Sequence, residues 1–205
     1  MLIGDRSGMI AGAKLPYDAE VEYVYGAGGA YVDTGVAWDT EMAFDVTWYQ
    51  RSKLAFAVVF GARDLSSAGA GYVLTGAGTA NSDGVYKLHV DMGGRRTDTQ
   101  VYGIANHWYR VVYTGSSAKV YRDDVLVNTV SIPQTSRSGT RTIYVCGLNN
   151  AGTINGYAGC GISHLALGSL RDFVPVRVGT SGYLYDRVSG QLFGNGDLTC
   201  GPDKS

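Results

Sequence analysis

Apolar and polar residues alternate along much of this chain after residue 20. In residues 42–49 (MAFDVTWY) the even positions are large and apolar, whereas the odd positions are small, polar or amphipathic. Because successive side chains of a strand point to opposite faces of its sheet, this pattern predicts a strand with one face in the core. Trp48 is the residue expected nearest the centre of that core. Residues 54–60 are nearly all apolar, which is typical of a central strand covered on both faces.

Turn signals divide the rest of the chain into more short strands. The C-terminal third holds three apolar pieces separated by Gly, Ser and Asn, which are typical of strands joined by tight turns. The chain has 30 glycines and only 4 prolines, and no segment has the apolar period of a helix. The sequence therefore predicts a sandwich or barrel with little helix. The further predicted strands cover residues 86–91, 107–114, 142–148, 161–167, 171–178, 182–186 and 189–196.

Both ends of the chain carry motifs of a known family. The front end reads LPYDAEVEY (15–23) and AYVDTG (30–35), and the far end reads RDFVPV (171–176) and GYLYDRVSGQLFGN (182–195). These motifs resemble the first and last strands of LamG-like, concanavalin A-like jelly-roll domains of gut-bacterial and phage surface proteins. The resemblance spans about residues 15–202. It implies an all-β fold, a two-sheet antiparallel jelly-roll sandwich, and is weaker evidence for any particular ligand.

The clearest predicted hairpin covers residues 118–127 (AKVYRDDVLV). Members of the family that the chain resembles place a glycine at the position of Asp124, where a two-residue turn needs a positive φ. Aspartate adopts that conformation less readily than glycine but more readily than most residues. We therefore expect a turn here in spite of the substitution.

Composition limits the partners and the cellular setting. The 205 residues fit one domain, and 45% are hydrophobic, which is enough for a large core. The net charge is −1 with no basic stripe, so a nucleic-acid partner is not expected, and no stretch is long and apolar enough to predict a membrane span. The 15 tyrosines suit half-buried strand positions or binding faces. The three cysteines, an odd number without a C-x-x-C pair, predict free buried thiols and synthesis in a reducing cytoplasm: Cys146, Cys160 and Cys200.

The first 16 residues differ from the rest and form a separate predicted unit, an irregular N-terminal arm ahead of the jelly-roll domain at 17–205. They have no clear period and lack the basic patch and apolar run of a secretory signal. Their content of Leu2, Ile3, Met9 and Ile10 is high for a free tail. An arm that docks on a partner is therefore favoured over a floppy tail, although both interpretations stay open.

No catalytic residue is expected. Asp18, Glu20 and Glu22 have the spacing of one strand face, but they lie at the entrance of the domain and lack the pattern of retaining glycosidases of this fold. A solvated edge strand is the simpler interpretation. The remaining candidates lack metal-binding or nucleophile spacing, and the three histidines lie on different predicted strands: Asp45, Asp91, His89, His107, His164, Cys146 and Cys160.

The loops offer a candidate ligand edge. Asparagine, aspartate and tyrosine suit sugar hydroxyls and sugar faces, although the same residues also make ordinary turns. Calcium is the one cofactor left open, because the loops are rich in aspartate but hold no D-x-D-x-D-G run. Gly26, Gly28 and Gly29 are interpreted as turn residues between Tyr25 and Tyr31, not as a phosphate loop. The candidate ligand-binding residues are Asn149, Asn150, Asn155, Tyr157, Asn81 and Asp83.

Together these features predict a non-catalytic surface module. The resemblance and the apolar arm favour a phage virion structural or adhesion protein of the head-fibre, decoration or tail-fibre type. Its arm would contact virion or surface proteins, its jelly roll would bind glycans or proteins, and a homo-oligomer is expected. The alternatives are a bacterial extracellular or cell-surface carbohydrate-binding module and, third, a jelly-roll glycosidase.

Overall fold

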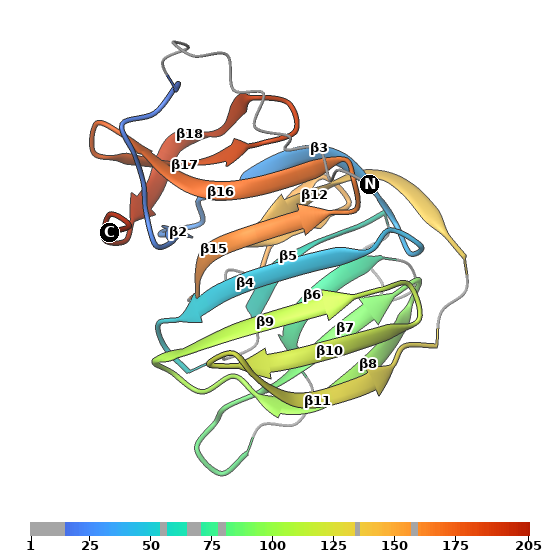
Figure 1. Ribbon diagram of the computed structural model, residues 1–205. Coiled ribbons are helices and arrows are strands. Elements are labelled where there is room, and N and C mark those ends of the chain that lie inside the picture. Colours follow the sequence, from blue (N-terminus) through green and yellow to red (C-terminus); the bar gives the residue numbers. More distant parts are fainter. Residues whose placement is uncertain (1–14, 54–56, 65–70, 78–80, 134–135, 157–159) are drawn as a thin grey trace, which may run out of the picture.

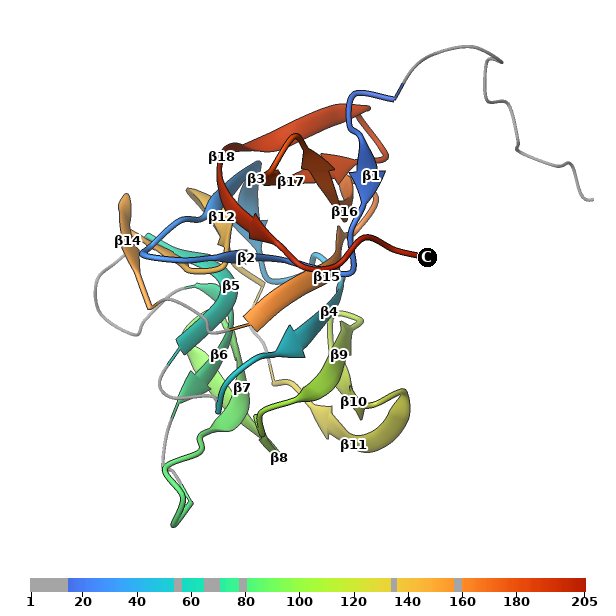
Figure 2. The ribbon, with the colours of Figure 1, turned by 90° about the vertical axis from the view of Figure 1, so that its left-hand side faces the viewer.

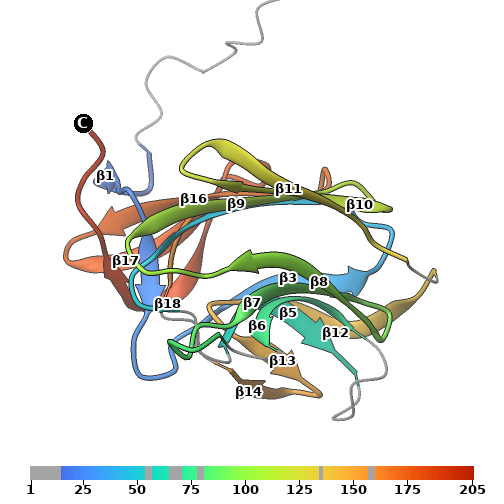
Figure 3. The same ribbon diagram turned by 90° about the horizontal axis from the view of Figure 1, so that it is seen from below.

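The computed structural model describes residues 15–53, 57–64, 71–77, 81–133, 136–156 and 160–205. These residues form eighteen strands and no helix, and the described part contains no helix long and apolar enough to cross a membrane. The strands lie in two layers that pack face to face (Figure 3). The prediction of an all-β, two-sheet sandwich is therefore confirmed.

The larger layer has ten strands and faces the viewer in Figure 1. All its pairings are antiparallel, and five of the ten join strands that are consecutive in the sequence. In spatial order the strands are β1 (Ala19–Glu20), β16 (Arg171–Val178), β17 (Ser181–Asp186), β18 (Gln191–Cys200), β2 (Val24–Gly26), β15 (Cys160–Leu167), β4 (Phe44–Gln50), β9 (His107–Tyr113), β10 (Ser117–Arg122) and β11 (Val125–Ser131).

The second layer has eight strands and includes one parallel pair, β13 with β5. Its continuous path runs through β14 (Thr153–Asn155), β13 (Leu148–Asn150), β5 (Ala57–Arg63), β6 (Tyr72–Ala77), β7 (Lys87–Met92) and β8 (Arg95–Tyr102). Two more strands complete it, β12 (Ser138–Val145) against β5 and β3 (Val32–Asp39) against β12.

One end of the larger layer closes on itself. Because β15 pairs with β16 as well as with β2, the strands β16, β17, β18, β2 and β15 form a closed ring. Figure 2 shows this ring with β3 beside it. The ring brings the start of β3 next to the middle of β18, two segments about 160 residues apart in the chain.

The core lies between the two layers and is rich in aromatic rings. In β4 every second residue is buried, as the alternation predicted, and Trp48 is fully buried against Tyr109 with ring centroids 5.5 Å apart. Its indole N–H donates to Gln50 Oε1 at 2.9 Å, so the polar end of the buried ring is satisfied. β5 is buried on both faces, which confirms a central strand; residues 54–56 of that prediction lie outside the described residues.

Candidate ligand-binding site

A hollow in the described part of the molecule lies where the closed ring of the larger layer meets β3. Its volume is about 600 Å³, within the range usual for small-molecule sites. One wall is the turn from β2 into β3, and the other is the middle of β18. The lining residues are Ala27, Gly28, Gly29, Ala30, Tyr31, Asp33, Gly194, Asn195 and Asp197.

Glycines shape the first wall. Gly28 and Gly29 have φ of 61° and 97°, and the Ala30 N–H donates to the Ala27 carbonyl at 3.2 Å to close the turn. At Gly26 a Cβ would lie 2.0 Å from the Ala30 carbonyl oxygen, so only glycine permits this turn. The interpretation of these glycines as turn residues between Tyr25 and Tyr31 is confirmed.

A bulge in β18 shapes the second wall. The pairing with β17 shifts from Leu184 opposite Phe193 to Gly182 opposite Leu198, so β18 uses three more residues than its partner over this stretch. The extra length leaves Asn195 and Asp197 exposed on the wall of the hollow. Bulges of this kind change the direction in which side chains point, and here the bulge makes part of β18 a wall of the hollow.

An aromatic pair supports one side of the hollow. Tyr31 stacks on Tyr144 of β12, with ring centroids 4.3 Å apart and planes 22° apart. Burial, a hydrogen bond with Tyr31 and the nearby charge of Asp33 raise the pKa of Tyr144 to about 12, so the Tyr144 phenol stays neutral at physiological pH. The stacking fixes the orientation of the Tyr31 ring, which lines the hollow.

The hollow therefore combines one fixed ring with oxygen-rich side chains. Asp33 is held by the Gly35 N–H, which donates to its Oδ1 at 2.9 Å, and the Asp197 N–H donates to Asn195 Oδ1 at 3.4 Å. Carboxylates accept hydrogen bonds from hydroxyl groups, and an amide both donates and accepts. A ring that offers an apolar face beside such groups suits a sugar, which has hydroxyls around its edge and an apolar face.

The predicted asparagines of the β13–β14 hairpin contact other parts of the protein or line a different cavity. Asn149 is only 3% exposed, and its amide donates to the Thr142 carbonyl and accepts from the Gly152 N–H. Asn150 accepts from Arg63 Nε at 2.8 Å. Asn155 lines a separate cavity of about 70 Å³ with Arg63. None of these three asparagines lines the hollow.

The other predicted positions do not line the hollow either. Asn81 Oδ1 accepts from the N–H groups of Asp83 and Val85, which is ordinary turn chemistry. The Asp83 carbonyl accepts from Lys53 Nζ at 2.9 Å. Tyr157 lies outside the described residues.

Sequence reasoning missed Tyr31, Asp33, Asn195 and Asp197 as site residues. The signal was present, because an aromatic ring directly follows a glycine-rich turn and an asparagine stands between two glycines in the GNG run at 194–196. The glycine-rich run was interpreted as a turn, and the GNG run was included in the predicted strand at 189–196. Nothing local indicated that the two turns would meet.

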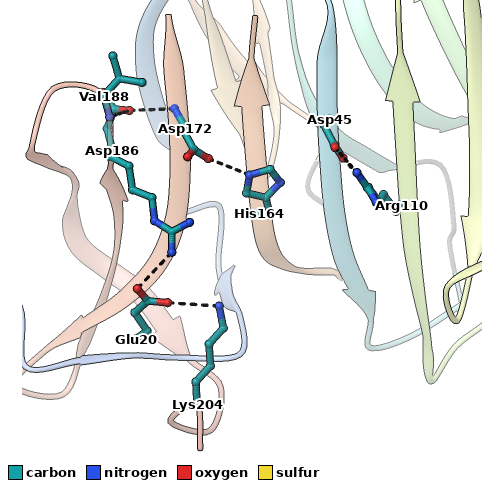
Figure 4. A network of polar contacts seen from close by, with 9 residues as sticks. Glu20, Asp45, Arg110, His164, Asp172, Asp186, Val188 and Lys204 are labelled. Carbon is teal, nitrogen blue, oxygen red and sulfur yellow. Dashed lines mark hydrogen bonds and ion pairs between the residues drawn. The ribbon is translucent and has the colours of Figure 1, made fainter. Parts of the chain in front are cut away.

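Carboxylates on the outer face of the larger layer have cationic partners. Asp45 forms a bidentate ion pair with Arg110, Asp172 contacts His164 at 2.9 Å, and Glu20 contacts Arg187 and Lys204 (Figure 4). The edge position predicted for Glu20 is confirmed, since β1 is the terminal strand of the layer.

Side chains of the types that bind metal ions do not gather in one place in the part of the chain that the structure describes. It contains no group of three or more His, Cys, Asp or Glu side chains placed to hold an ion. The three histidines lie on separate strands, β7, β9 and β15, as expected. The cysteines are free; Cys146 and Cys160 are buried as predicted, whereas Cys200 is only half-buried.

Comparison with solved structures identifies the architecture. A candidate carbohydrate-binding protein from Bacteroides ovatus matches with a TM-score of 0.58 at 10% identity, over 91% of this chain and 61% of that one. The fold is a jelly roll. The likeness concerns the fold alone at this identity, and this jelly-roll chain spans about three-fifths of the length of the Bacteroides protein.

Two further solved structures match this chain with lower TM-scores. A heptameric SAP-like pentraxin from Limulus polyphemus has a TM-score of 0.41 at 11% identity, over 74% of this chain and 76% of that one. Domains LG4-5 of the mouse laminin alpha1 chain have a TM-score of 0.45 at 16% identity, over 78% of this chain and 46% of that one. No protein-family model matches the sequence, and no curated protein matches it.

Proposed function

We propose that this jelly roll is a non-catalytic binding module that holds one sugar residue of a glycan in the hollow. The observation that carries the proposal is the fixed Tyr31 ring in the same hollow as Asp33, Asn195 and Asp197. The ring would stack on the apolar face of the sugar, and the polar side chains would bind its hydroxyls. The fold shared with a candidate carbohydrate-binding protein supports this choice.

A binding role fits the two carboxylates of the hollow better than a glycosidase role. A catalytic acid needs a raised pKa, which glycosidases obtain by placing a carboxyl in an apolar pocket. Asp33 and Asp197 are both exposed to solvent, so neither has that environment. Prolonged incubation of the protein with a glycan that it binds should produce no new reducing ends. If reducing ends did form, and their formation required Asp33 or Asp197, the protein would be a glycosidase and this proposal would be wrong.

The test combines a glycan array with calorimetry on the best glycan. Tyr31→Ala should weaken binding by about tenfold or more, because it removes the stacking surface, whereas Tyr31→Phe should retain most of the affinity. Asp83→Ala is a matched control, since Asp83 lies on a different loop. Equal binding by Tyr31→Ala and the wild type would remove the hollow as the site.

We propose further that a virion displays the module, with the N-terminal arm at residues 1–16 docking it on the particle. The support is the resemblance to phage surface proteins and the apolar content of this segment. Deleting residues 1–14 should abolish attachment to the particle and leave the circular dichroism spectrum unchanged. Retained attachment would contradict the proposal.

The alternative is a bacterial extracellular carbohydrate-binding module, which the Bacteroides ovatus structure favours. Light scattering together with the glycan array distinguishes a virion protein from a bacterial module. A monomer with strong selective glycan binding supports the bacterial module, whereas a trimer or larger assembly supports the particle protein.

A further inference from the structure

The outer face of the smaller layer holds a small cavity that the proposed sugar site does not use. Its volume is about 70 Å³, well below the ~300 Å³ at which ordinary ligand pockets begin. Because one water molecule takes up about 30 Å³ in the liquid, this cavity admits only a group of a few heavy atoms. A cavity of this size can select one substituent of a larger ligand whose remainder stays outside.

The floor of the cavity is apolar. Val58 of β5, Val73 of β6 and Leu148 of β13 line it and form a cluster of buried side chains separate from the main core. Val73 points to the outer face, because its neighbours Tyr72 and Leu74 belong to the core between the layers. The cluster therefore offers an apolar surface to a ligand that approaches the layer from outside.

Two glycines give the cavity its shape. Gly61 lies between Leu148 and Val73 in the sheet, and a Cβ there would stand 2.9 Å from Val73 Cγ1. The Gly156 carbonyl accepts from the Val58 N–H at 3.3 Å, and a Cβ at Gly156 would stand 2.9 Å from Val58 Cγ2. A side chain at either position would crowd the apolar floor, so this cavity depends on specific residues of several strands.

Charged groups border this floor. Asp91 of β7 is directly opposite Val73, and its Oδ1 accepts from Arg96 Nε of β8 at 3.3 Å. Burial raises the pKa of Asp91, and the ion pair with Arg96 offsets only part of this effect. Arg63 of β5 donates through Nε to Asn150 Oδ1 at 2.8 Å, and its terminal nitrogens have no hydrogen-bond partner among the described residues. A carboxylate acceptor and guanidinium donors thus line the same small cavity.

An apolar floor, a donor and an acceptor match the three parts of an acetamido group. Its methyl group is apolar, its carbonyl oxygen accepts hydrogen bonds and its N–H donates one. A carboxylate of similar size would bring a second negative charge beside Asp91. A hydroxyl group would leave the apolar floor in contact with water. Among small substituents, the acetamido group is the one that uses every wall of the cavity.

We propose that this cavity binds the acetamido group of an N-acetylated sugar. The methyl group would lie on Val73 and its apolar neighbours, the carbonyl oxygen would accept from Arg63, and the N–H would donate to Asp91. The sugar ring would stay outside, where the exposed side chains of Asn155 and Arg96 can bond its hydroxyls. An acetylated lysine carries the same group, but its aliphatic side chain would have to cross this polar mouth. The cavity shares no residue with the hollow, so it goes beyond the proposed function.

Titrations followed by NMR test the proposal with methyl glycosides of N-acetylglucosamine, N-acetylgalactosamine and glucose. At least one N-acetylated sugar should shift the amide signals of β5, β6 and β7, and magnetisation should transfer from the protein to its acetyl methyl group. Val73→Phe, which fills the cavity, and Asp91→Ala, which removes the acceptor, should each raise the apparent dissociation constant by about tenfold or more. Val188→Phe, at an exposed valine, is the matched control. Tyr31→Ala should bind like the wild type, which separates the cavity from the hollow.

The proposal would be overturned if neither N-acetylated sugar bound, if the glucoside bound equally well, or if both cavity variants bound like the wild type. Tighter binding of acetate or of an acetyl-lysine peptide would likewise exclude the sugar. If only Tyr31→Ala lost binding, the sugar would lie in the hollow, which contradicts this cavity and supports the proposed function. Unchanged thermal unfolding establishes that a loss of binding is local. If Val73→Phe unfolds, Asp91→Ala still decides, because Asp91 is only half-buried.

Discussion

At the scale of single residues, Asp186 at the end of β17 is the most constrained carboxylate. It is fully buried and accepts hydrogen bonds from the backbone of Asp172 at 2.9 Å and of Val188 at 3.1 Å, and from Ser189 Oγ at 2.6 Å. Burial alone would raise the pKa of Asp186, but these hydrogen bonds outweigh it and lower the pKa. The charged carboxylate therefore organises the turn from β17 to β18.

We expect Asp186→Asn to lower the free energy of unfolding by about 2 kcal/mol, because an amide cannot accept all of these bonds and leaves buried donors unsatisfied. The folded-state pKa lies below the unfolded value, so this stabilisation is present above the unfolded pKa and is lost as pH falls through the folded pKa. Urea unfolding at neutral and acidic pH measures both effects. Asp197→Asn, at an exposed carboxylate, is the control, and an equal loss in both variants would contradict the argument.

At the scale of elements, the β10–β11 hairpin shows how far sequence patterns reach. The turn was predicted with aspartate where glycine is usual, and Asp123 and Asp124 have φ of 51° and 62°. Their roles differ, which the sequence did not reveal. Asp123 accepts from the Trp108 N–H at 3.0 Å and contacts His107 Nδ1 at 2.6 Å, so its side chain ties the turn to β9.

We therefore expect opposite effects from two glycine substitutions in this turn. Asp124→Gly should stabilise the protein by about 0.5 kcal/mol, because the relief of left-handed strain exceeds the entropy that glycine loses on folding. Asp123→Gly should destabilise it by about 1 kcal/mol, because the hydrogen bonds to β9 are lost. Thermal unfolding of both variants measures these changes in stability. If both substitutions stabilised the protein, or both destabilised it, backbone strain would not be what distinguishes the two positions.

Alternation predicted those strands that have one buried face, such as β4 and β9, within one or two residues of their ends. β8 was not singled out, because RRTDTQVY carries little apolar signal and owes its place to pairing with β7.

The hollow could not be predicted for a related reason. Its walls are turns without a pattern of their own, and only the closed ring brings Asp33 beside Asp197. The asparagine-rich hairpin gave the stronger local signal, and in the structure its Asn149 amide is occupied by hydrogen bonds with the backbone.

At the scale of the whole molecule, each of the two layers contains one buried cysteine. Cys146 follows β12 in the smaller layer, and its N–H donates to the Val59 carbonyl of β5 at 2.9 Å. Cys160 begins β15 in the larger layer. Burial raises the pKa of Cys146 to about 11 and that of Cys160 well above its ordinary value, so neither is a reactive thiolate in the folded state. Both belong to the one core that the two layers share.

This arrangement makes thiol labelling a test of whether the layers unfold together. Under native conditions an aromatic disulfide reagent should react quickly with one thiol, the half-buried Cys200, and Cys200→Ser should remove that fast phase. The other two should react slowly and at one common rate, because a single shared core opens as a unit. Mass spectrometry of partly labelled protein assigns each rate to its cysteine. If Cys160 reacted much faster than Cys146, the ten-stranded layer would open while the other stayed folded, and the sandwich would not be one cooperative unit.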